Sequence, residues 1–260
     1  MEPNPQLDEG WRAWGRSLAA LVAATFALGT VLSVLDSLNI TTPAPTYPAG
    51  ANLPDRILGT LQNQSQRFPW ILVATLAATV GFAAIAALAP VLRRALGATE
   101  WRASVLTGGL VLGGAIGIVA ELGFLGGQVV ASDPTYCDCD FAAIQLIARS
   151  GLLDLVSTVQ TWLLAGFLVL VGAGLFAAIR AARESPEVPR GWGTLTAVLA
   201  AVLVGVAIWV VGFPLLANAL AWRIDVNAIT GLPSLIVLLI LVPWWALWLR
   251  AWLARPATQE

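Results

Sequence analysis

Six long apolar segments follow one another along this chain, and they constrain its fold more than any other feature of the sequence. A helix needs about 20 apolar residues to cross a hydrocarbon core roughly 30 Å thick, and each segment reaches that length. Backbone polar groups in lipid must be paired internally, and the strand alternation typical of a barrel is absent. We therefore predict an all-α, polytopic integral membrane bundle of six transmembrane helices. The predicted spans are 17–38, 69–92, 104–130, 153–179, 194–217 and 232–253.

The overall composition agrees with lipid as the main solvent. Of the 260 residues, 58% are hydrophobic and only 11% are charged, whereas soluble domains carry about a quarter charged residues. The connections between spans are short, so we predict a single membrane domain over residues 1–260. A net charge of -1 does not provide the clustered positive charge that nucleic acid requires, so we expect no nucleic-acid partner.

The residue types that are missing exclude several kinds of chemistry. The chain has no His and no Lys, and its only Met is Met1. It therefore lacks the usual axial ligands for haem, a His-based zinc or copper site, and a Lys for Schiff-base chemistry. We predict no cofactor, no metal site and no catalytic residue.

The arginines predict the orientation of the chain in the membrane. All 14 basic residues are Arg, and the connecting segments on one side of the six spans hold ten of them. Cytoplasmic connections carry the excess of positive charge, so both termini are predicted to be cytoplasmic. The richer set is Arg12, Arg16, Arg93, Arg94, Arg102, Arg180, Arg183, Arg190, Arg250 and Arg255, and the poorer set is Arg56, Arg67, Arg149 and Arg223.

This orientation places three connections on the outer side, at 39–68, 131–152 and 218–231. Asp55 to Gln66 within the first connection has the pattern of a short interfacial helix. The acidic start of the chain does not fit a cleaved signal peptide, so the first span is expected to be retained. The exclusive use of Arg is typical of a GC-rich bacterial genome, and we predict the bacterial inner (plasma) membrane as the location.

Glycines recur every four residues on the third predicted span, at Gly109, Gly113 and Gly117. Residues at this spacing share a helix face, and a face without side chains lets a neighbouring backbone approach closely. We predict that this helix packs at the centre of the bundle. An alternative is a ligand or partner helix that lies against the bare backbone.

Glu121 is the one carboxylate well inside a predicted span, about 10 Å from its outer end at the helical rise. A charged carboxylate facing lipid is costly, so Glu121 is predicted to point into the bundle and either to find a partner or to be protonated there. Its role is either a structural hydrogen bond or ligand binding. The candidate binding set toward the outer side is Glu121, Asp154, Thr158, Gln160, Arg149 and Asp36, with Arg149 as the cation placed to neutralise an acid.

The second outer connection holds both cysteines, Cys137 and Cys139, among aspartates. Three interpretations stay open: a local disulfide in a small strained ring, an intermolecular disulfide, or a two-thiolate metal site that lacks further strong ligands. A disulfide or free thiols in a loop cap fits the pattern best.

The layout of six helices, a long first outer connection and Arg-marked inner connections such as Leu92-Arg-Arg-Ala resembles uncharacterised bacterial six-helix membrane proteins grouped as domains of unknown function. The resemblance implies no activity. We expect a non-enzymatic protein in the lipid bilayer, either an accessory subunit that binds itself or a membrane-complex partner, or a small-molecule or lipid binder or transporter. The alternative is a membrane enzyme that uses Glu121 and Asp154 as acid and base.

Overall fold

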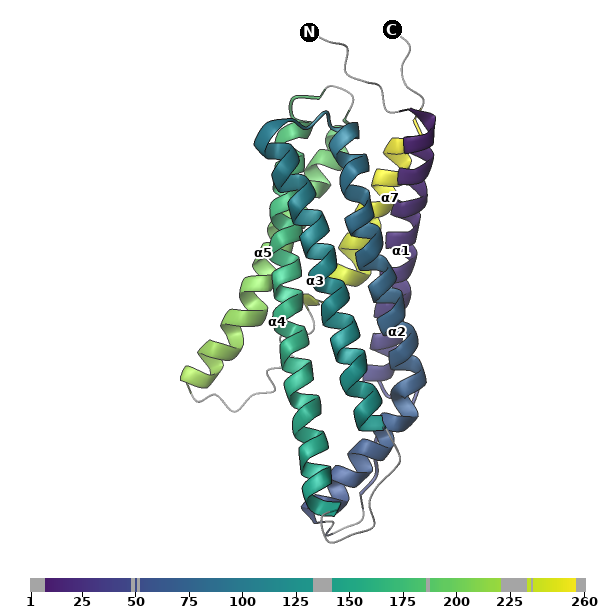
Figure 1. The fold of residues 1–260 in the computed structure, drawn as a ribbon, viewed down its shortest axis with the longest axis vertical. Helices are drawn as coiled ribbons and strands as arrows, with labels where there is room; N and C mark the ends of the chain where they lie inside the picture. Colours follow the sequence, from purple (N-terminus) through teal and green to yellow (C-terminus); the bar gives the residue numbers. More distant parts are fainter. Residues whose placement is uncertain are drawn as a thin grey trace.

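The computed structural model describes residues 8–47, 50, 52–132, 142–185, 188–220, 233–234 and 236–255. Within these ranges the chain is helical without β-strands, and its long helices form one elongated bundle (Figure 1). We name the end where α1 begins and α7 ends the terminal end, and the opposite end the distal end. The elements are α1 (Glu9–Ser37), α2 (Leu53–Ala95), α3 (Glu100–Ser132), α4 (Ala142–Ala182), α5 (Arg190–Ala219), the π-helical turn η1 (Val237–Leu241) and α7 (Val242–Leu253).

Five described helices, α1 to α5, are long and apolar enough to cross a membrane. Their outward faces carry large apolar side chains such as Leu112, Phe176 and Ile208, which are 57%, 57% and 67% exposed. A soluble bundle would not leave such faces in water. The predicted all-α membrane class is thus confirmed for the described residues, and the protein is a multi-pass membrane protein with lipid contact. The sixth predicted span corresponds to a shorter apolar helix, Val237–Leu253.

The helices extend well beyond the predicted spans toward the distal end. The segments 53–68 and 142–152 were predicted as parts of outer connections, but they continue α2 and α4, which have 43 and 41 residues. At the helical rise these helices are about 60–65 Å long, roughly twice the hydrocarbon thickness. Asn52 caps α2 by accepting a hydrogen bond from the N–H of Asp55 at 2.9 Å.

A small separate core explains why these extensions are helical. Leu61 of α2 and Ala131 of α3 are fully buried, and they pack with Ile57, Leu58 and Leu153. Hydropathy alone does not detect this packing, because it depends on contacts between residues of different helices. Residues 221–230 of the third predicted connection lie outside the described part.

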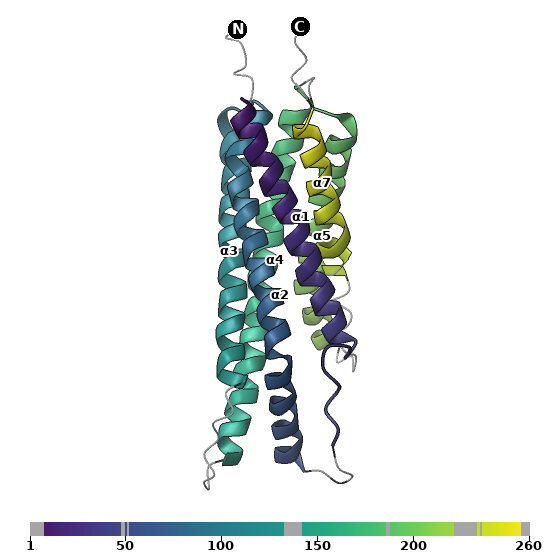
Figure 2. The same ribbon diagram turned by 90° about the vertical axis from the view of Figure 1, so that its right-hand side faces the viewer.

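The helices pack in chain order around the bundle. α1 contacts α2, α2 contacts α3, and α3 contacts α4, with the most extensive contact between α3 and α4. α7 returns to lie beside α1 (Figure 2), whereas α5 follows α4 at the terminal end and diverges from it toward the distal end (Figure 1). Phe82 lies in the core, where its ring makes edge contacts with Phe26 at 5.1 Å and Phe167 at 4.6 Å between centroids.

Tryptophans join α5 to α7 at the terminal end. The buried ring of Trp192 lies 4.9 Å from Trp252, centroid to centroid, and 6.3 Å from Trp245. The Trp245 indole N–H donates to the buried hydroxyl of Thr196 at 3.0 Å. Nearby, Arg102 of α3 pairs with Glu184 after α4, and its hydrogen bond lowers the pKa of the Glu184 carboxyl. These contacts hold α5 against α7, and α3 against the segment that follows α4, at the terminal end.

The turn η1 interrupts the helical segment between residues 236 and 253. The N–H of Val242 donates to the carbonyl of Val237, five residues earlier, and Pro243 has no N–H with which to continue an α-helical ladder. The wide turn places Leu238 beside the interior of the distal half, where it lines the cavity described below.

The glycines of α3 lie at its closest contacts. A Cβ added at Gly109 would lie 2.5 Å from the carbonyl oxygen of Leu170 and 2.8 Å from the backbone of Gly174. The same addition at Gly113 would meet Val171 of α4 at 2.7 Å, and at Gly117 the ring of Phe82 at 2.6 Å. The glycine face of α3 therefore contacts α4 at Gly109 and Gly113 and α2 at Gly117. Two further glycines lie at close contacts outside the predicted pattern. Gly114 packs on the α2 backbone, and Gly174 of α4 packs on the backbone of Gly109.

The substitution Gly109→Ala is expected to lower thermal stability, because its methyl group would push α3 away from the backbone of α4. Overpacking typically costs about 1–3 kcal/mol. Gly108→Ala is the matched control, since a Cβ there meets nothing within 4 Å and Ala favours the helix. Thermal unfolding in detergent should give a lower midpoint for Gly109→Ala only. Equal midpoints would contradict the close contact.

Candidate functional site

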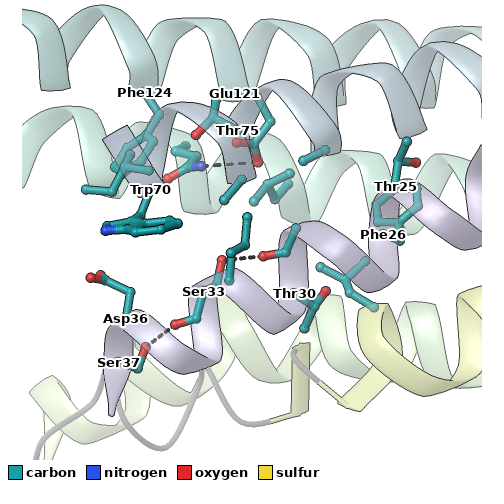
Figure 3. Close-up of a pocket in the computed structure, with 18 of the residues that line it drawn as sticks. Thr25, Phe26, Thr30, Ser33, Asp36, Ser37, Trp70, Thr75, Glu121 and Phe124 are labelled. Atoms are coloured by element: carbon teal, nitrogen blue, oxygen red, sulfur yellow. Dashed lines mark hydrogen bonds between the residues drawn. The ribbon is translucent and has the colours of Figure 1, made fainter. Parts of the chain in front are cut away.

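A cavity of about 370 Å³ lies inside the distal half of the bundle, between α1, α2, α3, α4 and Leu238 of η1. Much of its wall is apolar, and four aromatic side chains contribute to it: Phe26, Trp70, Phe82 and Phe124. Trp70 is 43% exposed and Ser33 and Ser37 are also exposed, so the cavity reaches the surface near its distal edge. Figure 3 shows these walls, with α1 on one side and Trp70, Phe124 and Glu121 on the other.

Glu121 of α3 contributes a carboxyl group to the cavity wall. The residue is only 8% exposed, and it accepts one hydrogen bond, from the side-chain amide of Gln160 on α4 at 3.3 Å. It lies one helical turn after Gly117, whose packing against Phe82 brings this part of α3 close to α2. Among the described residues, no arginine lies within ion-pair distance of Glu121. The carboxyl is therefore buried with a single neutral donor.

A polar cluster lies at the distal edge of the cavity. The Nε of Arg67 on α2 lies 3.5 Å from a carboxylate oxygen of Asp36 on α1, and both side chains are mostly buried. The same Asp36 oxygen accepts a hydrogen bond from the Thr41 hydroxyl at 2.9 Å, and Arg67 donates to the Asn39 side-chain oxygen at 2.6 Å. Asn39 has a positive φ of 55°, which Asn tolerates. The cluster fastens the end of α1 to α2.

Hydroxyl groups and the side-chain amide of Gln64, which donates to the Gln128 side-chain oxygen, are further polar features of the wall. Thr30 of α1 and Thr75 of α2 are 6% and 4% exposed, and both line the cavity. The Ser33 hydroxyl donates to the carbonyl of Gly29 in its own helix at 2.9 Å, so its proton is already used within the helix. Its oxygen can still accept a hydrogen bond from a ligand.

The structure brings together three of the six predicted binding residues: Glu121, Gln160 and Asp36 all line this cavity. Asp154 and Thr158 do not, and both are exposed on α4. The Thr158 hydroxyl donates to the Asp154 carbonyl. Asp154 precedes Gln160 by six residues, which places the two side chains about 120° apart around the helix, so Asp154 points to another face. Glu121 and Asp154 do not form an acid/base pair.

Arg149 was predicted to neutralise an acid of this set, but it is not part of the cavity wall and does not bond to Glu121. The cation that the cavity does contain is Arg67, which the sequence analysis counted only for orientation. The sequence contained a signal for this pairing. Arg67 lies two residues before the second predicted span, on the same side of the membrane as Asp36 at the end of the first span.

Two further predictions have different outcomes. Cys137 and Cys139 lie outside the described residues, so their bonding stays a prediction. Within the described residues, no three acidic, Cys or His side chains gather as a metal site would require. What the cavity offers chemically is an apolar, aromatic space with the Asp36–Arg67 ion pair at its edge, the Glu121 carboxyl without a charged partner, and a few amide and hydroxyl groups, which suits an amphipathic molecule.

Comparison of the chain with known protein families, with curated proteins and with solved structures finds no match.

The hydrogen bond from Gln160 is expected to stabilise the fold. Gln160→Leu would leave the buried Glu121 carboxyl without its donor, at a cost of about 1–3 kcal/mol. Thermal unfolding midpoints in detergent test this, and Thr161→Val on the exposed face of α4 is the control, since its hydroxyl donates only to the Ser157 carbonyl. A second substitution, Glu121→Leu, should restore much of the loss. A Gln160→Leu midpoint equal to that of the wild type would show that the contact contributes nothing.

Proposed function

We propose that this protein is a non-enzymatic, multi-pass protein of the bacterial plasma membrane that binds a small amphipathic molecule or lipid from the outer side. Its cavity around Glu121 carries the proposal. At about 370 Å³ the cavity falls within the size range of small-molecule sites, and such sites combine apolar walls with a few polar groups. The Arg-rich terminal end is assigned to the cytoplasm, so the distal edge of the cavity faces outward.

Binding agrees with the wall chemistry better than catalysis does. A reaction that uses one side chain as general acid and another as general base needs two titratable groups within reach of one substrate. Asp154 is on another face of α4, and Asp36 is held by Arg67 and Thr41. This leaves Glu121 as the single acid without a charged partner among the described lining residues. One acid suffices to orient a ligand.

The inner end of the cavity is closed, which favours binding over an open transport path. Phe26, Phe82 and Phe167 are at most 2% exposed, and the Phe82 ring contacts each of the other two edge to face. Beyond them, toward the terminal end, Leu88 and Leu92 are fully buried. A transported molecule would have to displace this whole aromatic and aliphatic core.

A second candidate function is partner binding through the distal extension. The exposed side of α4 presents Ile147, Leu155, Val159 and Trp162, which are 48–60% exposed. The length of α4 places the first of these residues beyond the level where α1 ends (Figure 1). An accessory subunit would use this side rather than the cavity.

The orientation is testable with single cysteines in a protein whose Cys137 and Cys139 have been replaced by Ser. Gln62→Cys at the distal end should react with a membrane-impermeant maleimide in intact cells. Thr99→Cys at the terminal end should react only after permeabilisation, because both positions are exposed but on opposite ends of the bundle. The opposite pattern of labelling would reverse the assigned topology.

Filling the cavity is expected to abolish ligand binding. Ala78→Phe places a ring in the cavity, whereas the matched control Ala83→Phe places the same ring on an exposed face of α2. The probe is a diazirine derivative of dodecanol, photolysed with the protein in nanodiscs. Mass spectrometry should find labelled peptides containing Trp70 or Phe124 in the wild type and control, and several-fold fewer in Ala78→Phe. Equal labelling would contradict the cavity as the site and favour the distal surface.

A further inference from the structure

The charged groups of the cavity do not balance. Three charged side chains line it: Asp36, Arg67 and Glu121. Arg67 is already committed to Asp36 and to the Asn39 oxygen, so that pair is neutral as a unit. Glu121 belongs to a different helix, α3, and has only the neutral Gln160 as its partner. With both acids ionised, the described lining carries a net charge of minus one.

A buried carboxylate with one donor is incompletely satisfied. An ionised carboxylate has about four acceptor positions, and its charge is costly away from water unless cations or several donors accompany it. The bond from Gln160, at 3.3 Å, is near the long limit for hydrogen bonding. The missing interaction partner is therefore positively charged or a proton.

The aromatic side chains around Glu121 point to the same ligand chemistry. Trp70 and Phe124 lie on the side of the cavity where Glu121 projects, with the Trp70 indole between Phe124 and Asp36 in this view (Figure 3). Phe82 also contributes to the wall. The face of an aromatic ring attracts cations, most strongly when water is excluded. An anionic ligand would meet the Glu121 charge, and the Arg67 charge is already balanced by Asp36 at 3.5 Å, although the Arg67 Nε has no hydrogen-bond partner.

We propose that the ligand of this cavity is an amphipathic organic cation, an amine or quaternary ammonium with an apolar body. Its cationic group lies between the Glu121 carboxylate and the aromatic rings, and its apolar body contacts Ile71, Leu164 and Leu238. This inference rests on the proposed function, because it requires the cavity to be a binding site.

Competition with protons follows from the same arrangement. A proton and a cationic ligand neutralise the same Glu121 carboxylate, so lowering the pH should weaken cation binding. The other charged groups that face the cavity are Asp36 from α1 and Arg67 from α2, and the described lining residues of α4 and η1 contribute none. Because Asp36 is paired, Glu121 is the group that should dominate the pH dependence.

The experiment compares two photoreactive probes of equal chain length in nanodiscs, the diazirine derivatives of dodecyltrimethylammonium and of dodecanol. The quaternary ammonium stays charged at every pH, so any pH effect belongs to the protein. In the wild type, the cationic probe should label the peptides of Trp70 and Phe124 at several-fold lower concentration than the alcohol does. Its labelling should weaken as the pH falls.

Glu121→Gln should remove both the preference for the cation and its pH dependence, while labelling by dodecanol persists. Asp154→Asn is the matched control, because it makes the same chemical change at an exposed site outside the cavity, and it should behave as the wild type does. Cation preference that survives in Glu121→Gln, or is absent from the wild type, would overturn the inference. Absence of cavity labelling by either probe would overturn the proposed function itself.

Discussion

The contact between the backbones of α3 and α4 at Gly109 and Gly174 is the constraint on which the rest of the structure depends. Lipid offers no hydrophobic driving force between apolar helices, so close packing and interhelical hydrogen bonds must hold them together. Gly113 continues this contact with α4, and Gly117 packs against Phe82 of α2, so α3 is fixed between α2 and α4. A fixed α3 turns Glu121 inward, within reach of Gln160. Wider helix spacing would lose that hydrogen bond.

Features that follow from the need to hydrogen-bond the backbone within lipid could be predicted from the sequence. Apolar runs gave the helical class and the approximate positions of five spans, and the isolation of Glu121 within such a run predicted its inward direction. The helical character of Asp55–Gln66 was predicted, but as a short separate helix and not as the start of α2, and the extension of α4 was missed. A helix outside lipid depends on contacts such as Leu61 with Ala131 and not on hydropathy. Those contacts join residues far apart in the chain.

The candidate site was predictable only in part, for a geometric reason. Asp154 and Gln160 are near one another in sequence and both are polar, but the helical period places their side chains about 120° apart. The sequence does not show how α4 is rotated about its own axis, so it does not decide whether Asp154 or Gln160 faces α3. Arg67 and Asp36 are separated by a whole connection, so their pairing depends on how the segment after α1 folds back, which local patterns do not encode.

The difference in length between α1 and its neighbours determines how a molecule would approach the cavity. α1 ends at Ser37, whereas α2 and α4 continue for several turns beyond that level (Figure 2). In the proposed orientation, the edge marked by Asp36 and Arg67 would lie at the depth where acyl chains meet headgroups. Amphipathic molecules accumulate at that depth of a bilayer and diffuse there in two dimensions. Access then depends on partitioning into one leaflet, so effective affinity would vary with the lipid composition around the protein.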